Sequence, residues 1–119
     1  MQTFSTDFYS MELYPKYVIL TINEEIVLNL QRASVIRQKL SEAFKNGEFL
    51  MISNRKYKHT VTKEIYDKGY LPNMKGLAIV SKSEEEREKA ILEQKLYGKS
   101  FAFFTELDDA KSWAESYFY

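Results

Sequence analysis

The sequence predicts a single α/β domain, in which an N-terminal β-hairpin precedes a mostly parallel sheet with crossover helices, in the order β-β-α-β-α-β-α-β-α. Three continuous apolar runs of strand length support this prediction: FLMIS at residues 49–53, GLAIVS at 76–81 and FAFF at 101–104. Strands that are buried on both faces of a parallel sheet have this continuous apolarity. Segments with helical periodicity separate the runs, as crossover connections require. We therefore expect the three runs to be parallel strands in the interior of the sheet.

The composition indicates one folded domain over residues 1–119. The chain is 45% hydrophobic and 15% aromatic, whereas disordered chains are poor in aromatic residues. Seventeen basic and seventeen acidic side chains give a formal net charge of zero, which argues against a dedicated nucleic-acid binder. The chain has no cysteine, which excludes thiol catalysis, disulfides and thiolate metal sites.

The expected compartment follows from three further absences in the sequence. The N-terminal segment MQTFSTDFYSMELYPKY has no basic region followed by an apolar one, so it lacks the pattern of a signal peptide. No apolar run approaches the ~20 residues needed to span a bilayer. The lack of cysteine fits a reducing compartment. We expect a cytoplasmic protein without a transmembrane segment.

The N-terminal third of the chain predicts a hairpin followed by a helix. Two β-rich runs, TFSTDFYSMELY and YVILTI, are separated by Pro15-Lys16, which is typical of an antiparallel hairpin. After residue 25 the apolar period changes to three or four, and Asn46-Gly47 marks a helix end. The apolar face of this helix is expected to comprise Ala33, Ile36, Leu40 and Phe44.

Two more helices are predicted between the apolar runs. A short one is indicated around residues 63–70, closed near Pro72. Ser83 and Glu86 have the spacing of a capping box, and the acidic residues 84–86 complement the helix dipole as a solvated first turn. This helix is expected to end at Gly98. Its inner face is predicted to contain Ala90, Ile91 and either Leu96 or Tyr97.

The C-terminal segment predicts a last strand that leads directly into a helix. Thr105 and Asp108 again have capping-box spacing. One helical stripe follows, made of Leu107, Ala110, Trp113 or Ala114, and Tyr117. Because aromatic side chains dominate core burial, we expect Trp113 to pack this stripe onto the sheet.

Three segments together resemble the small bacterial STAS/SEC14-like domains that are related to anti-sigma-factor antagonists: MISNRK, MKGLAIVSKS and SFAFFTELDDAKSWAES. The terminal pattern F-x-x-F followed by T-x-x-D-A-x-x-W is the most recognisable of them. The resemblance implies a small α/β domain used for protein–protein contact, sometimes switched by serine or threonine phosphorylation. Regulated members carry the acceptor in a D-x-S-G-like turn after the central strand, where this chain reads NRKYKHTVT at residues 54–62.

The residue types that usually carry catalysis are sparse. His59 is the only histidine, and one histidine without cysteine is a weak basis for a zinc site. The sequence contains neither a G-x-S-x-G nucleophile turn nor a glycine-rich phosphate loop. We therefore predict no catalytic residue, no metal and no cofactor, and we expect that the protein is not an enzyme.

The basic segment after residue 53 is the most promising candidate site. Arg55 directly follows a buried strand, and Ser81-Lys82 and Thr105-Glu106 leave the neighbouring strands at the same end. Ligands of open α/β sheets favour this crevice beyond the carboxyl ends of the strands. The segment is either a solvated loop or a ligand or partner site with Arg55 at its centre, gripping a carboxylate or phosphate. The site would comprise Asn54, Arg55, Lys56, His59 and Thr60, with the threonines either capping the next helix or donating to the ligand.

These observations favour a non-enzymatic regulatory or scaffolding domain that acts by protein–protein interaction. The alternative is a small-ligand or anion-binding domain that uses loop 54–62, and an uncharacterised enzyme ranks last. A weak homodimer is a further expectation, because Tyr117, Phe118 and Tyr119 cannot all face inward from one helical stripe. The sequence names neither the partner nor the ligand.

Overall fold

The computed structural model describes residues 1–57, 60–62, 64–65 and 71–118. In chain order the elements are β1 (Gln2–Ser5), β2 (Tyr9–Leu13), β3 (Tyr17–Ile22), β4 (Val27–Leu28), α1 (Leu30–Phe44), β5 (Phe49–Asn54), β6 (Thr60–Val61), β7 (Met74–Val80), α3 (Glu84–Tyr97), β8 (Ser100–Phe104) and α4 (Leu107–Tyr117). The helix predicted at residues 63–70 lies largely outside the described residues. Within the described part of the chain, no helix combines the length and the apolarity needed to cross a bilayer.

The main sheet has six strands in the order β1-β2-β3-β5-β7-β8. Strand β2 is antiparallel to both β1 and β3, and β3, β5, β7 and β8 run parallel. A second sheet pairs the two short strands β4 and β6. The predicted α/β architecture, an antiparallel start followed by parallel strands with helices between them, is therefore confirmed.

The N-terminal run that was predicted as one strand folds back on itself as β1 and β2. Ser5 pairs with Ser10 across the turn. The Thr6 amide donates to the Tyr9 carbonyl at 2.8 Å, and the Thr6 hydroxyl accepts from the Tyr9 amide at 3.3 Å. Short polar side chains favour turns because they bond to the nearby backbone, and the Thr6-Asp7 pair supplies that chemistry. The start of the sheet is thus a three-stranded meander.

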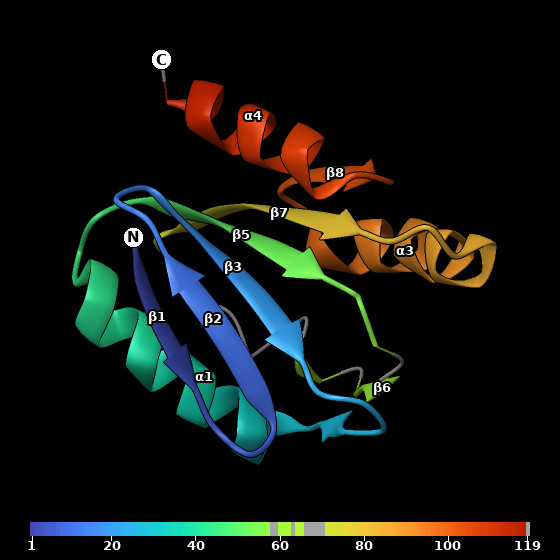
Figure 1. The fold of residues 1–119 in the computed structure, drawn as a ribbon, viewed down its shortest axis with the longest axis horizontal. Coiled ribbons are helices and arrows are strands. Elements are labelled where there is room, and N and C mark those ends of the chain that lie inside the picture. The colour runs from blue at the N-terminus through green and yellow to red at the C-terminus, as the bar shows by residue number, and fades with distance from the viewer. Residues whose placement is uncertain (58–59, 63, 66–70, 119) are drawn as a thin grey trace.

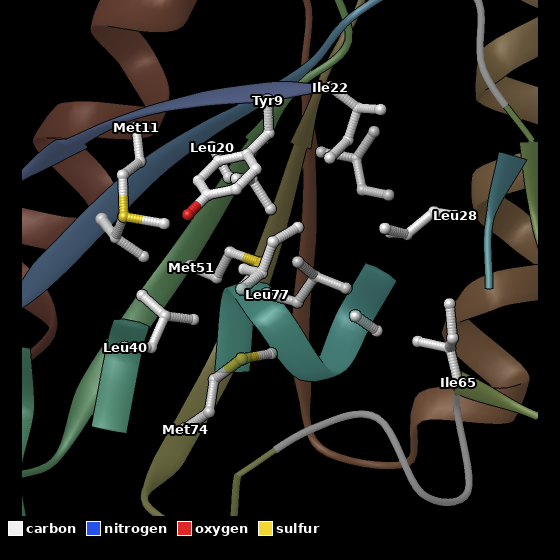
Figure 2. Close-up of a cluster of buried hydrophobic side chains, with 14 of the residues drawn as sticks. Tyr9, Met11, Leu20, Ile22, Leu28, Leu40, Met51, Ile65, Met74 and Leu77 are labelled. Carbon is white, nitrogen blue, oxygen red and sulfur yellow. The ribbon is translucent and has the colours of Figure 1, made fainter. Parts of the chain in front are cut away.

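Helices cover the sheet on both faces (Figure 1). Helices α1 and α3 lie on one face, and α4 lies on the other. The larger hydrophobic cluster, on the α1 and α3 side, brings together Tyr9 of β2, Met51 of β5 and Leu77 of β7 with Leu40 of α1 (Figure 2). The smaller cluster packs Ala110 and Ala114 of α4 against the opposite face. Two small residues let α4 approach the sheet closely.

Strands β5 and β7 occupy the interior of the sheet as predicted, but β8 does not. It pairs with β7 in the predicted parallel orientation, yet it is the edge strand, and four of its residues are only half-buried. Its continuous apolar run reflects contact with both hydrophobic clusters rather than a neighbour on each side. Continuous apolarity reports coverage of the two faces, and it does not distinguish an edge strand from a central one.

The caps of α3 match the prediction, while its buried face differs. Ser83 is the N-cap and accepts from the Glu86 amide, and Gly98 ends the helix in the left-handed conformation at φ 75°. The prediction that Ile91 faces inward was wrong, because this side chain is 53% exposed, whereas Ala90 and Tyr97 are buried as predicted. The other buried residues are Glu86 and Glu93.

Helix α4 begins later than the predicted capping box requires. Its N-cap is Glu106, with no side-chain capping bond, so Thr105 is not the cap. Trp113 packs against the smaller cluster as expected, with its ring 6.1 Å from Phe104 and 5.7 Å from Tyr117 between centroids. It is half-buried, however, and Ala110 and Ala114 are the residues in full contact with the sheet.

We expect Trp113→Ala to lower the free energy of unfolding by about 2 kcal/mol. A fully buried tryptophan costs about 3–5 kcal/mol when truncated, and the half-exposed ring loses less contact. Urea denaturation measures this change, and Ser112→Ala, on the exposed side of the same turn, is the matched control. A loss below 0.5 kcal/mol (roughly the range of neutral surface changes) would mean that the ring does not stabilise the fold.

Stability should fall at alkaline pH because Tyr9, Tyr17 and Tyr97 are buried in their neutral form, and burial raises the pKa of each. Burial raises the pKa of Tyr97 to about 12, and burial together with a 2.8 Å hydrogen bond to Glu115 raises the pKa of Tyr17. The unfolded chain ionises near pH ~10, so the unfolded state then loses protons that the folded state keeps. The free energy of unfolding should be constant below about pH 10 with respect to these groups and decrease between about pH 10 and 12. The double variant Tyr17→Phe/Tyr97→Phe should show a weaker decrease, and an unchanged decrease would contradict this assignment.

Candidate functional site

A crevice of about 520 Å³ opens at the carboxyl ends of β5, β7 and β8. Three loops frame it, one after each strand. Its lining residues are Asn54, Arg55, Lys56, Tyr57, Val80, Ser81, Lys82, Ser83, Glu86, Thr105, Glu106 and Leu107. The crevice lies where the parallel topology predicts a binding site.

Backbone hydrogen bonds hold the floor of the crevice. The Arg55 amide donates to the Val80 carbonyl at 2.9 Å, and the Ser81 amide donates to the Phe104 carbonyl at 3.0 Å. Each loop therefore stays attached to the neighbouring strand for one residue beyond the β5–β7 and β7–β8 ladders. The Ser81 hydroxyl accepts from the Ser83 amide at 3.1 Å, which fixes the second loop where it enters α3.

Three of the five predicted site residues line the crevice: Asn54, Arg55 and Lys56. Thr60 does not line it, because this residue belongs to β6 and its amide donates to the Ile26 carbonyl at 3.0 Å. The Thr62 amide bonds similarly to Leu28, at 3.1 Å. His59 lies outside the described residues. Loop 54–62 thus leaves the crevice to form the small second sheet.

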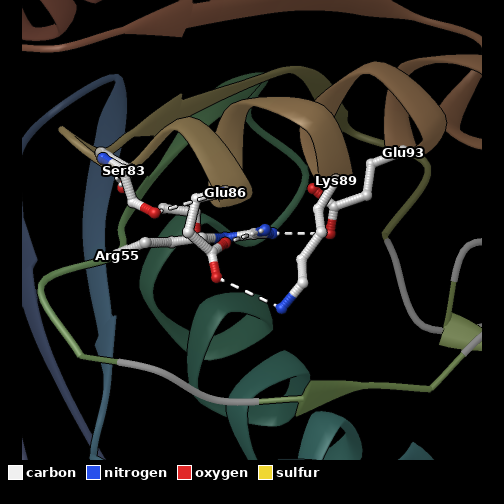
Figure 3. A network of polar contacts seen from close by, with 7 residues as sticks. Arg55, Ser83, Glu86, Lys89 and Glu93 are labelled. Carbon is white, nitrogen blue, oxygen red and sulfur yellow. Dashed lines mark hydrogen bonds and ion pairs between the residues drawn. The ribbon is translucent and has the colours of Figure 1, made fainter.

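The side chain of Arg55 is enclosed by the protein, with 7% of its surface exposed. Its Nη1 lies 3.2 Å from a Glu86 carboxylate oxygen, and its Nη2 lies 2.8 Å from Glu93. Figure 3 shows the guanidinium extending from the end of β5 toward these two glutamates on α3. Lys89 binds the second oxygen of Glu86 at 3.5 Å, and the Arg55 Nε donates to the Ser53 hydroxyl at 3.4 Å. The group predicted to grip an external carboxylate grips two internal ones.

The sequence interpretation missed the role of Glu86 and Glu93. The acidic segment was taken as a solvated helix start, which describes Glu84 and Glu85 because both are exposed. Glu86 and Glu93 are buried, and they share a helical stripe with Ala90 and Tyr97 at spacings of three and four. Carboxylates on the buried stripe of a helix require a cation beneath them. That spacing was the available signal, and Arg55 at the end of the adjacent strand was the available cation.

The charges around the crevice nearly balance. Lys82 pairs with Glu106 at 3.4 Å on the surface. The charge of Arg55 is neutralised by the carboxylates of Glu86 and Glu93. Lys56 lies 5.6 Å from the centre of the Tyr57 ring, and both residues are exposed. The crevice therefore presents an aromatic ring, hydroxyls and mixed charges above a floor that backbone hydrogen bonds hold in place.

Other parts of the described chain are less suited to a site. A hollow of about 50 Å³ lies within the larger hydrophobic cluster, lined mostly by core residues such as Ile36, Met51 and Leu77. Among the residues that the structure describes, no group of three or more His, Asp or Glu side chains is placed to hold a metal ion.

The C-terminal aromatic residues make contacts within the chain. Tyr117 is 37% exposed, and its hydroxyl lies 3.0 Å from the Ser100 hydroxyl. Phe118 packs against the smaller cluster, with the Lys16 ammonium 5.5 Å from its ring centre. Tyr119 lies outside the described residues. Of the three predicted dimer contacts, Tyr117 is thus the one placed beside an open edge of the sheet.

The fold defines a class of small α/β domains in which an antiparallel start leads into parallel strands, with the candidate crevice at their carboxyl ends. A solved structure of this class is similar: an uncharacterized protein of the DUF3478 family from Shewanella loihica PV-4, which has a SpoIIAA-like fold. The TM-score is 0.61 at 16% sequence identity, over 93% of this chain and 98% of that one. The chain therefore has a SpoIIAA-like fold, as the resemblance to STAS-like domains predicted. No family model and no curated protein matches the sequence.

We expect Arg55→Ala to reduce the free energy of unfolding by about 3–5 kcal/mol, because it leaves two buried carboxylates without their cation. Lys56→Ala removes the neighbouring exposed charge and should change stability by less than about 0.5 kcal/mol. Chemical denaturation of both variants measures the difference. If Arg55→Ala were as stable as Lys56→Ala, the ion pairs would not hold α3 on the sheet.

Proposed function

We propose that this domain is a non-enzymatic regulatory or scaffolding module that binds a protein partner through the strand-end crevice. The observation that carries the proposal is the crevice itself, about 520 Å³ in volume, framed by the ends of three parallel strands. Its walls combine exposed Tyr57 and Lys56 with the surface ion pair of Lys82 and Glu106. Aromatic residues such as Tyr57 are enriched at protein interfaces, and charged residues such as Lys56, Lys82 and Glu106 suit the polar rim that surrounds an interface core.

The rigid floor supports this proposal. The backbone bonds at Arg55 and Ser81 and the buried ion pairs restrain the loops before any partner arrives. A preorganised surface loses less conformational entropy on binding, so more of the contact energy contributes to affinity. The fold is consistent with the proposal, because the resemblance to STAS-like domains implies protein–protein contact.

The alternative, a small-anion site on loop 54–62, has less support from the geometry. Arg55 is occupied by Glu86 and Glu93, and Thr60 belongs to the second sheet. The first turn of α3 also carries exposed Glu84 and Glu85, between Ser83 and Glu86 of the crevice lining, and this negative charge disfavours an anion. Lys56 and Lys82 remain as cations, and Lys82 already pairs with Glu106.

Photo-cross-linking from the crevice tests the proposal. A photoreactive phenylalanine analogue replaces Tyr57, which is 39% exposed and lines the crevice. We expect a discrete protein adduct in extract of the source cells, absent when the analogue replaces Lys111 on α4 instead. The adduct should be competed by excess wild-type protein.

A charge-reversal variant then measures the contribution of the crevice to affinity. Once the cross-linked partner is purified, Lys56→Glu/Lys82→Glu should weaken its binding by at least about tenfold, or ~1.4 kcal/mol. Lys111→Glu is the matched control and should bind as the wild type does. Equal binding by all three proteins would reject the crevice as the partner site. If no protein adduct forms and inorganic phosphate raises the melting temperature in a thermal-shift assay, the small-anion alternative would be favoured instead.

A further inference from the structure

The outer edge of β8 is one of the two unpaired edges of the main sheet in the described part of the chain. No strand pairs with the outer side of β8 among residues 1–57, 60–62, 64–65 and 71–118. Ser100–Phe104 contains no proline and no charged residue, although edge strands are usually guarded by such residues, by bulges or by a covering segment. The opposite edge strand, β1, is also uncharged and unpaired on its outer side in this part of the chain, but all four of its residues are exposed, whereas four residues of β8 are half-buried against the hydrophobic clusters.

Apolar side chains flank the open edge on both faces of the sheet. On one face, Ile91 of α3 is 53% exposed and borders a groove of about 260 Å³ along Phe101 and Phe103. On the other face, half-buried Trp113 and exposed Tyr117 of α4 lie beside Phe104 and Ser100, respectively. An edge strand with apolar flanks is the expected appearance of a surface that another strand covers.

The hydrogen-bond pattern of β8 determines which residues can pair outward. The Phe104 carbonyl accepts from Ser81, which follows β7, so Phe104 directs its backbone groups inward. Because backbone groups alternate along a parallel strand, Ser100 and Ala102 also direct theirs toward β7. Phe101 and Phe103 therefore present their N–H and C=O groups to the open side.

We propose that a second copy of this chain pairs its β8 antiparallel with this edge, with the two-fold axis at Ala102. In this register Phe101 is opposite Phe103 of the second copy, so the four outward-facing backbone groups of each strand meet in hydrogen-bonded pairs. Ala102 is opposite Ala102 of the second copy, and the strands continue into one twelve-stranded sheet, twice the six of one chain. The contact is isologous, as a two-fold dimer requires.

The side chains around the edge are self-complementary in the same register. The phenylalanines form cross-strand aromatic pairs on the α3 face. Ile91 borders the middle of the strand, next to Phe101 and Phe103, and therefore lies close to Ile91 of the second copy. The zero net charge of the chain adds no long-range repulsion between copies.

This dimer is independent of the crevice and places a different surface at the contact. It includes Tyr117, which lies beside Ser100, and so it gives one of the C-terminal aromatic residues a role at the interface. The crevice lies at the carboxyl ends of the strands, so both copies would keep it accessible at opposite ends of β8.

Disulfide trapping tests the register directly, because the chain has no native cysteine. Directly opposed residues of a pair that is not hydrogen-bonded have their Cβ atoms about 4.5–5.5 Å apart, close to disulfide geometry. We expect Ala102→Cys to form a covalent dimer under mild oxidation, while Ser112→Cys on the exposed side of α4 stays monomeric at the same concentration. If the two variants form equal amounts of dimer, the proposed register is wrong.

Sedimentation of the full chain provides the second measurement. The wild type should show a reversible monomer–dimer equilibrium at micromolar concentrations, and Ile91→Lys should raise its dissociation constant at least about tenfold by placing like charges near the axis. Leu92→Lys is the matched control, because Leu92 is 62% exposed on the opposite flank of the same helix, and it should leave the constant unchanged. Circular dichroism verifies that both variants fold. A wild type that stays monomeric at high micromolar concentration, or a dimer that Ile91→Lys does not weaken, would overturn the proposal.

Discussion

The position of α3 depends on the buried ion pairs between Arg55 and the glutamates 86 and 93. This helix has two buried apolar side chains, Ala90 and Tyr97, so hydrophobic contact alone holds it weakly on the sheet. The ion pairs replace part of that contact, and they connect the end of β5 to two glutamates that lie about two turns apart on α3. A buried ion pair stabilises little relative to apolar residues of the same shape, but removal of one member is costly. The triad therefore acts mainly by selecting one arrangement of the helix.

This selection also explains why α3 exposes apolar residues. A rotation of the helix that buried Ile91 would gain about 1.5–3 kcal/mol from that side chain. The same rotation would separate Arg55 from its carboxylates, and a buried charge left uncompensated costs about 3–5 kcal/mol. The electrostatic cost exceeds the hydrophobic gain, so the charged stripe faces the sheet. Ile91 consequently lies beside the open edge of β8, where the proposed second copy would cover it.

The fold was predictable from the sequence wherever one periodic signal dominated. The apolar runs located β5, β7 and β8, and the Ser83 and Gly98 caps located the ends of α3. The prediction failed where two signals conflicted. The inner face of α3 was assigned from apolar residues, whereas the pairing of Arg55 decides it, and a local pattern does not reveal a partner that lies 31 residues away in the chain. The edge position of β8 was missed for a related reason. The order of strands in the sheet depends on which strands pair, and the apolarity of one run does not reveal its neighbours.

For the candidate site, the location was predictable from the sequence and the chemistry was not. Its location follows from topology, because the carboxyl ends of parallel strands meet at one edge whatever their side chains are. Its chemistry depends on which charges remain available after folding, and folding engages the guanidinium that the sequence offered most prominently. What remains at the surface is Lys56, Tyr57 and the Lys82–Glu106 pair. A site whose strongest cation is engaged within the protein has little basis for holding a small anion, but it retains a rigid, chemically mixed surface. That combination is the physical reason for favouring a protein partner.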